Sequence, residues 1–387
     1  MVASQIALSL VLLVSAGLFL RSMVKLATLD VGFDRNGVLL VNTNLKAAKV
    51  APELRLQIYD EIEALLQKLP GVISVGRSWR TPVTGYEWNE YVSIDSPSAP
   101  KGDDSLVYFN YVSPGYFATL HTSLLAGRDF QASDTKTAPG VAVVNEAVAR
   151  KFFPGANPVG KTFRVGSGSH EPGRTFQVVG LVKDSKYESL REATLQQAFF
   201  PISQIPGNDD SEYFEIRTAT RPESLNAAVQ NSVAQVNKAI SLEFGTLAKQ
   251  IEDSLVQDRL LATLSAFFGG LALLLAMIGL FGSLSYLVTQ RQPEFGIRMA
   301  LGAMPVSILR LVLREVATVL FVGVAAGLCL ALAAVRVLES LLFGMSTRDS
   351  VTLVAATLLL AVAALAAGYL PARRAMRIDP MDALRYE

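Results

Sequence analysis

Residues 260–290 read LLATLSAFFGGLALLLAMIGLFGSLSYLVTQ, a run of 31 residues without a charged side chain. A helix needs about 20 mostly apolar residues to cross about 30 Å of hydrocarbon, because each residue adds about 1.5 Å along its axis. This stretch is therefore long enough to span a membrane as a single helix.

Three further uncharged stretches meet the same criterion, residues 2–20, 316–335 and 351–370. The four spans are arranged as one, then a long insertion, then three in quick succession. The first span could instead be a signal peptide, but no Lys or Arg precedes it and Arg21 and Lys25 follow it, which favours a retained anchor. Because Met1 lies almost at the membrane, we expect the chain to be part of a longer protein.

The basic residues near the span ends predict the orientation of the chain. The loop between the third and fourth spans holds only Arg336 and Arg348, whereas arginines cluster after residues 260–290 and in the C-terminal tail. This pattern places both chain ends in the cytoplasm and the large insertion outside, although Arg21 and Lys25 disagree locally. The cytoplasmic arginines are Arg291, Arg298, Arg310, Arg314, Arg373, Arg374, Arg377 and Arg385.

The overall composition is that of neither a soluble domain nor a disordered chain. Charged residues make up 18% of the chain, below the roughly 25% of soluble domains, and 51% of the residues are hydrophobic, which excludes intrinsic disorder. The net charge of +1 gives no overall basic surface for nucleic acid. We expect a soluble ectodomain joined to membrane helices.

The insertion alternates helical and strand-like patterns. Residues 52–69 and 224–239 carry apolar side chains at helical spacing, and Asn145 is placed to cap a short helix. The strand-like stretches are residues 72–75, 106–112, 141–144, 176–182 and 213–218. The sequence therefore predicts a mixed α/β ectodomain in two lobes.

One segment matches the phosphate-binding loop pattern. Residues 155–162 read GANPVGKT, with Gly155, Gly160, Lys161 and Thr162 at the required spacing. Such a loop needs a strand before it and a helix after it, whereas here a helical pattern enters and β-like residues leave. We interpret this match as a turn and predict no nucleotide site.

The usual catalytic and metal-binding patterns are missing from the sequence. His121 and His170 are far apart, with no Cys or Glu at metal-ligand spacing, and no nucleophile elbow is present. The four uncharged stretches also lack the ionisable groups that ion-coupled carriers use. We therefore predict no enzyme activity, no metal and no cofactor, and an energy source on another polypeptide.

Two membrane-associated segments carry recognisable patterns. After the second span, Pro293 suits a first helical turn, Glu294 and Arg298 are four residues apart in the favourable order, and Gly302 suits a helix end. This helix could contact a partner or lie at the membrane surface. In the third span, small residues recur every four positions and predict close packing on another helix, within the chain rather than in a dimer. They are Gly323, Gly327 and Ala331.

Several motifs together resemble the MacB/FtsX-like ABC transporter permeases. The segment 294–303, EFGIRMALGA, is similar to the family's EIGIRxALGA, and the tail 371–385, PARRAMRIDPMDALR, to its PARRAxRxDPxxALR. In the ectodomain, VSPGYF at 112–117, GRDF at 127–130, VNEA at 144–147 and NPVGK at 157–161 resemble the MacB-type periplasmic core domain, and LLFG at 341–344 also fits. The pattern is closest to the duplicated orphan permeases of acidobacteria, as a single unit.

The resemblance implies a transmembrane helix at 1–25, a periplasmic core domain of two α/β lobes at 26–255, and an FtsX-like permease domain at 256–387 with spans at about 260–290, 310–335 and 351–370. It implies a bacterial inner-membrane protein with a separate cytoplasmic ABC ATPase and a second permease unit, as a dimer or a fused twin, and allows a periplasmic protein partner. MacB itself carries its ATPase ahead of the first span, and this sequence has none there. The residues implied to face the ATPase are Glu294, Phe295, Gly296, Ile297, Arg298, Met299, Leu301 and Gly302, and those implied at the membrane edge are Arg373, Arg374 and Arg377.

Three functions remain open on the sequence alone. The first is a permease subunit that couples ATP hydrolysis on another subunit to motion of the periplasmic domain, for export or mechanical work. The second is a non-transporting regulator or scaffold that activates a periplasmic partner. The third, a membrane-anchored enzyme, is disfavoured because no catalytic group of residues is found.

Overall fold

The computed structural model describes residues 2–375 with internal gaps. The gaps are Ser98 and residues 167–172, 205–209, 302–303, 339–342 and 344–348. The chain divides into two compact units, one made of Met1–Thr28 with Leu255–Glu387, the other of Leu29–Ser254. We call them the membrane unit and the periplasmic unit.

The described residues of the membrane unit form four helices long and apolar enough to cross a membrane, which confirms the predicted arrangement of one span followed by three. They are α1 (Val2–Ala27), α7 (Val256–Gln290), α9 (Pro305–Leu338) and α10 (Ser350–Ala375). A shorter helix, α8 (Gln292–Ala300), lies between α7 and α9 in the chain. All four long helices extend beyond the uncharged stretches, because charged residues are tolerated where a span leaves the hydrocarbon.

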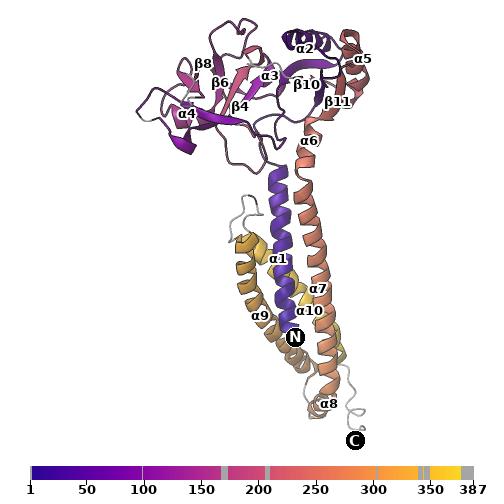
Figure 1. The fold of residues 1–387 in the computed structure, drawn as a ribbon. Helices are drawn as coiled ribbons and strands as arrows, with labels where there is room; N and C mark the ends of the chain where they lie inside the picture. The colour runs from indigo at the N-terminus through magenta and orange to yellow at the C-terminus, as the bar shows by residue number, and fades with distance from the viewer. Residues whose placement is uncertain are drawn as a thin grey trace. The chain divides into compact units, whose positions relative to one another are not determined.

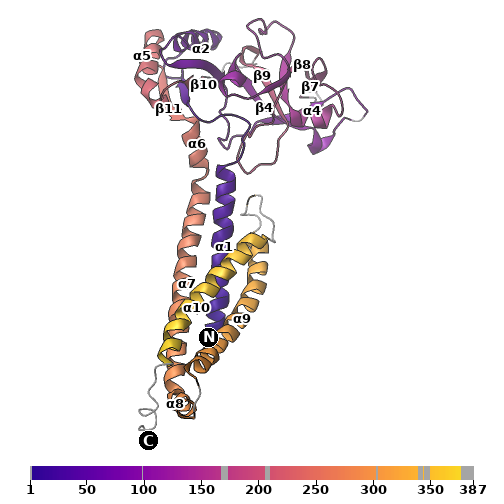
Figure 2. The same ribbon diagram turned by 180° about the vertical axis from the view of Figure 1, so that it is seen from behind.

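Helix α1 lies among the other three spans and contacts each of them (Figures 1 and 2). Its side chains Ile6, Leu10 and Val14 are buried in a core that also includes Ala331 of α9. A Cβ at Gly323 would lie 2.6 Å from Cγ2 of Ile6, and one at Gly327 would lie 3.0 Å from the backbone of Ala7. The three small residues of α9 therefore face α1 of the same chain, and at Gly323 and Gly327 any larger side chain would collide with α1.

The first lobe of the periplasmic unit is an antiparallel sheet covered by two helices (Figure 1). The helices α2 and α5 pack on one face through Tyr59, Ile62 and Val229, against Phe214 and Ile216 of the sheet. In sheet order the strands are β11 (Ser241–Thr246), β1 (Val38–Asn44), β10 (Ser211–Thr218) and β2 (Val72–Ser78). The helices of this lobe are α2 (Pro52–Leu66), η3 (Pro222–Leu225), α5 (Asn226–Val236) and α6 (Leu247–Ser254).

The second lobe is a closed six-stranded β-barrel. Its strands follow the order β4, β3, β7, β8, β6, β9, and β9 returns to pair in parallel with β4. Inward-facing residues alternate along the strands, as in Phe109 and Tyr111 of β4 or Phe176 and Val178 of β8, and form the core of the barrel. The elements are β3 (Asn89–Ser93), η1 (Gly102–Ser105), β4 (Leu106–Val112), α3 (Tyr116–Thr119), β5 (Leu124–Gly127), β6 (Val141–Asn145), α4 (Glu146–Phe152), β7 (Thr162–Val165), β8 (Arg174–Val182), β9 (Gln197–Pro201) and η2 (Ile202–Gln204).

The two lobes share a single pair of strand residues, Ser78 of β2 and Val112 of β4. Two backbone hydrogen bonds flank this pair: Trp79 N donates to Tyr111 O at 2.9 Å, and Ser113 N donates to Arg77 O at 2.9 Å. The lobes are thus parts of one sheet, joined at a narrow crossing.

Two predicted helices are shorter in the structure. The helix expected at 52–69 ends at Leu66, and the one expected at 224–239 is α5, which ends at Val236 because Asn237 takes an extended conformation. The predicted cap at Asn145 is confirmed, since its side chain accepts a hydrogen bond from Val148 N at 3.1 Å.

A buried arginine links the helix layer of the first lobe to its sheet. Arg77 of β2 donates to Glu63 of α2 at 2.6 Å and to Glu212 of β10 at 3.2 Å, and it also pairs with Asp60. Burial raises the pKa of Glu212 to about 7, an effect that outweighs the opposing attraction of Arg77. Burial also raises the pKa of Glu63. Near neutral pH, this cluster therefore takes up protons that an unfolded chain would not.

We expect the periplasmic unit to lose stability as the pH rises from about 5 to 8. The pKa of Glu212 is about 7 in the folded state and about 4.3 in an unfolded chain. Between these pH values the folded state binds more protons than the unfolded state, so the free energy of unfolding falls as the pH rises through 7. The measurement is the thermal unfolding of the full chain, followed by tryptophan emission, since both tryptophans, Trp79 and Trp88, lie in this unit.

Glu212→Gln should flatten this pH dependence, because the amide cannot titrate and still accepts from Arg77. The matched control is Glu61→Gln on α2, where the side chain is exposed, and it should follow the parent curve. A Glu212→Gln curve as steep as that of the parent would contradict the assignment.

Candidate functional site

Helix α8 forms a sharp junction at one end of the membrane unit. The carbonyl of Arg291, between α7 and α8, accepts a hydrogen bond from Phe295 N at 3.0 Å. Pro293 occupies the first turn, where its missing N–H leaves no bond unmade. The sequence between α7 and α9 thus forms a separate short helix, as predicted.

One side of α8 is anchored in the helix bundle. Phe295 is 1% exposed and packs in a core with Val288 of α7, Val312 of α9 and Ala372 of α10. Gly296 is also buried, and Met299 packs against the same core. Helix α8 is therefore packed against three of the four spans.

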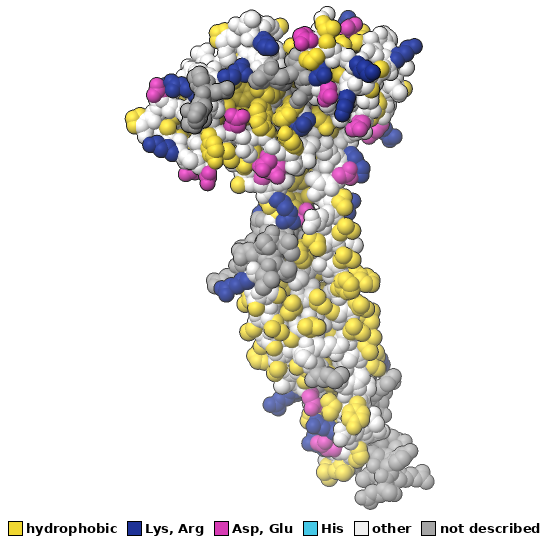
Figure 3. Space-filling view, viewed as in Figure 1, with side chains coloured by type: hydrophobic (Ala, Val, Ile, Leu, Met, Phe, Trp, Pro, Cys, Tyr) yellow, Lys and Arg dark blue, Asp and Glu magenta, His cyan; other side chains and the backbone are white. Residues whose placement is uncertain are grey.

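The other side of α8 combines a charged pair with exposed apolar residues. Arg298 donates to Glu294 at 2.7 Å, and both side chains are close to half exposed. Ile297 is 50% exposed and Leu301 is 83% exposed. Figure 3 shows charged side chains gathered near this end, whereas hydrophobic ones cover the outside of the spans. Such a mixture suits contact with another protein or with the membrane surface.

The structure therefore divides the residues predicted to face a partner. Glu294, Ile297, Arg298 and Leu301 lie on the exposed side, whereas Phe295 and Gly296 point into the bundle. The sequence analysis did not separate a buried side of this helix from an exposed one, although helical periodicity places Phe295 and Met299 one turn apart on the same side.

Some residues predicted to face the ATPase or the membrane edge cannot be assigned to either side. Gly302 and Arg377 lie outside the described residues, as does the side chain of Arg374. Arg373 is exposed near the end of α10, two residues after Pro371.

The segment with the phosphate-loop pattern connects helix α4 to strand β7. Gly155 and Gly160 have positive φ angles of 73° and 86°, as in turns. Gly160 N donates to Val178 O at 2.8 Å, and Lys161 O accepts from Val178 N at 2.8 Å. The loop backbone is thus hydrogen-bonded to the barrel, and the helix that a phosphate site requires is replaced by a strand.

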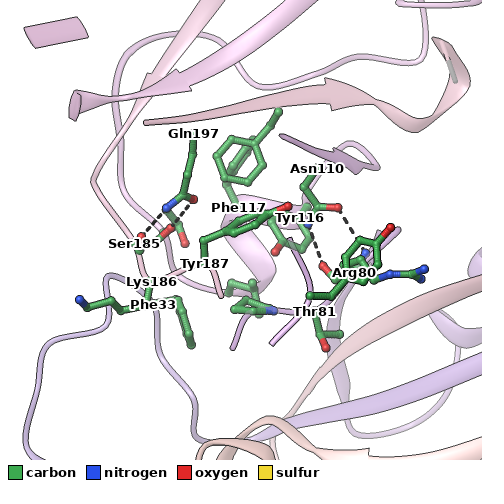
Figure 4. Close-up of a pocket in the computed structure, with 15 residues that line it drawn as sticks. Phe33, Arg80, Thr81, Asn110, Tyr116, Phe117, Ser185, Lys186, Tyr187 and Gln197 are labelled. Carbon is green, nitrogen blue, oxygen red and sulfur yellow. Dashed lines mark hydrogen bonds between the residues drawn. The ribbon is translucent and has the colours of Figure 1, made fainter. Parts of the chain in front are cut away.

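A small pocket lined by both aromatic and polar side chains lies beside the crossing between the two lobes (Figure 4). Its polar groups bond to one another: Asn110 Nδ2 donates to Arg80 O at 2.7 Å, Gln197 Nε2 donates to Ser185 O at 2.5 Å, and Tyr187 OH donates to Phe109 O at 2.6 Å. These side-chain groups are therefore already hydrogen-bonded to other residues of the chain. Among the described residues, no cluster of three or more His, Cys, Asp or Glu could hold a metal ion.

Two family models match most of the chain. The MacB-like periplasmic core domain matches residues 6–236, and the FtsX-like permease C-terminal domain matches residues 266–380. The chain belongs to the MacB/FtsX-like permease family. It is a multi-pass inner-membrane protein with a large periplasmic domain.

Relatives of this MacB/FtsX-like permease include exporters. It is 29% identical to the pyoverdine export ATP-binding/permease protein PvdT of Pseudomonas savastanoi pv. phaseolicola, over 85% of this chain and 48% of that protein. It is 28% identical to the macrolide export ATP-binding/permease protein MacB of Escherichia coli K12, over 85% of this chain and 49% of that protein. The chain spans about half the length of these curated relatives. The solved periplasmic region of MacB from Actinobacillus actinomycetemcomitans aligns at 16% identity over 60% of this chain and 97% of that structure, with a TM-score of 0.39.

We expect Phe295→Ala to release α8 from the bundle of this permease. Replacing a packed Phe by Ala leaves a cavity, and amide exchange in α8 should accelerate by about tenfold or more. The measurement is hydrogen–deuterium exchange of the full chain in lipid nanodiscs. Leu301→Ala is the control, because this side chain is 83% exposed. Equal protection of α8 in the two variants would show that Phe295 is not the anchor.

Proposed function

We propose that this chain is the permease component of an ABC transporter, in which a separate cytoplasmic ATPase moves the periplasmic domain. The observation that carries the proposal is the two-sided helix α8, with Phe295 fixed in the bundle and Glu294, Ile297, Arg298 and Leu301 exposed. A helix that is rigidly held on one side and available on the other is suited to transmit motion from a bound partner.

The partner chemistry follows from the exposed side of α8. Glu294 and Arg298 offer both signs of charge, while Ile297 and Leu301 offer apolar contacts that would be buried on binding. Arg291 also pairs with Glu315 of α9 at 3.5 Å, which fixes the start of α8 relative to the third span. We propose that the ATPase binds this surface, and that Arg373 and Arg374 hold the nearby end of α10 at the membrane edge.

The path to the periplasmic unit runs through two covalent connections. One residue separates the end of α6 at Ser254 from the start of α7 at Val256, and ten residues separate the end of α1 at Ala27 from the start of β1 at Val38. Of these two, α7 is also the helix on which α8 docks. Motion of α8 would therefore reach the periplasmic unit through α7, and α1 would follow because α9 packs tightly on it.

The work performed outside the membrane would be export or mechanical transmission. The two relatives described above are named as pyoverdine and macrolide exporters, which supports export as the first function to test. The described spans carry no credible ion-coupling site, so the energy would come from the ATPase. A second permease unit, as a dimer or a fused twin, and a periplasmic partner complete the proposed assembly.

Site-specific photocrosslinking tests the contact with the ATPase. A photoreactive residue at Arg298 should capture a co-expressed ABC ATPase in native membranes, because Arg298 lies on the exposed side of α8. The matched control is the same probe at Lys25, near the C-terminal end of α1, which leads into the periplasmic unit. Capture of no ATPase from position 298, or equal capture from both positions, would overturn the proposal.

A further inference from the structure

In the described part of the chain, helix α4 covers one end of the barrel of the periplasmic unit. Helix α4 follows β6 directly from Asn145, and its side chains Val148 and Phe152 complete the barrel core. Strand β6 runs antiparallel to β9, and β9 runs parallel to β4. Helix α4 therefore covers the end opposite to the carboxyl ends of β4 and β9, and those ends surround a separate opening.

A cavity of about 210 Å³ occupies that opening. Its lining is dominated by aromatic rings: the rings of Trp88 and Tyr111 stack with centroids 5.3 Å apart, and those of Phe176 and Phe200 approach to 4.5 Å. Phe109 forms a further part of the wall. We call these five residues the aromatic cup. A dry apolar cavity of about 150 Å³ is enough to bind benzene, so the cup has room for a group of one or two rings.

Two opposite charges flank the aromatic cup. Glu90 lies opposite Val107 in the β3–β4 register, and Arg174 lies opposite Val165 in the β7–β8 register, so both occupy inward positions. Both residues line the cavity. Burial raises the pKa of Tyr111 to about 12, an effect that Arg174 opposes and Glu90 adds to.

Neither charge is neutralised by the described part of the chain. Among the described residues, no ion pair or hydrogen bond is made by the side chains of Glu90 and Arg174, and the Arg174 guanidinium lies over the Phe176 ring at 5.2 Å. In contrast, Arg164 of β7 follows the inward-facing Phe163, and its Nη2 atom lies 3.9 Å from Oδ2 of Asp95. A carboxylate and a guanidinium beside an apolar cup are the polar groups that orient a bound molecule.

We propose that this barrel mouth binds an amphipathic molecule that carries both an amine and an acid group. Its apolar ring, of one or two fused rings, enters the aromatic cup, its amine pairs with Glu90, and its acid group pairs with Arg174. This site goes beyond the proposed function, because binding here requires neither the ATPase nor the α8 surface.

Ligand-observed fluorine NMR on the full chain in lipid nanodiscs tests the two charges separately. The probes are 5-fluorotryptamine, which carries an amine, 5-fluoroindole-3-acetate, which carries a carboxylate, and neutral 5-fluoroindole. Glu90→Gln should weaken the amine probe by about tenfold and leave the carboxylate probe unchanged, and Arg174→Gln should do the reverse. The neutral probe should bind the parent and both variants equally.

Arg164→Gln is the matched control, and all three probes should bind it as they bind the parent. Unlabelled indole should displace both charged probes, because all share the aromatic cup. The proposal is overturned if no probe binds, if both substitutions weaken both charged probes alike, or if indole fails to displace them. Loss of α8 crosslinking would leave these results unchanged, so failures of the two proposals are distinguishable.

Discussion

The buried guanidinium of Arg77 is the constraint on which the periplasmic unit depends. An unpaired charge at this depth would be very costly, so α2, β2 and β10 must keep Asp60, Glu63 and Glu212 around it. The next residue, Ser78, makes the strand pair with the barrel, and the ring of Trp79 then packs edge-on against Trp88 of the barrel with centroids 5.3 Å apart. Three successive residues thus fix the helix layer, the crossing and the barrel. A shift of β2 by one residue would bury the wrong side chain at each of these places.

A different physical rule governs the membrane unit. In hydrocarbon there is no water to satisfy backbone groups, so every span is a helix, and association depends on close packing rather than on the hydrophobic effect. This explains why α9 presents glycines to α1, and why Phe295 matters at the bundle end. Large side chains are used where α8 must be anchored, and the smallest where two spans must touch. Both kinds of packing, a large aromatic anchor and a close glycine contact, therefore occur within the membrane unit.

The sequence was sufficient for features that depend on local or long periodic signals. The four spans and the cap at Asn145 follow from hydropathy and from the chemistry of one side chain, and the motifs of segment 294–303 pointed to the family. The closed barrel did not follow, because β9 (Gln197–Pro201) reads QAFFP, without alternation, and its pairing with β4 joins residues about 90 positions apart. The inward side of α8 was also missed, since it depends on which helices surround Phe295. Which residues contact an ATPase stays a prediction.

The strand β1 has a consequence for how this protein is made. It is the first strand after α1, yet its two neighbours in the sheet, β10 and β11, lie near the other end of the periplasmic segment. Until residues 211–246 have crossed the membrane, β1 has no partner on either edge, and its buried Leu39 and Val41 stay exposed to solvent. The first lobe therefore completes its fold only after translocation of the whole segment. Before that point β1 is an unpaired apolar strand, the kind of segment on which aggregation can begin.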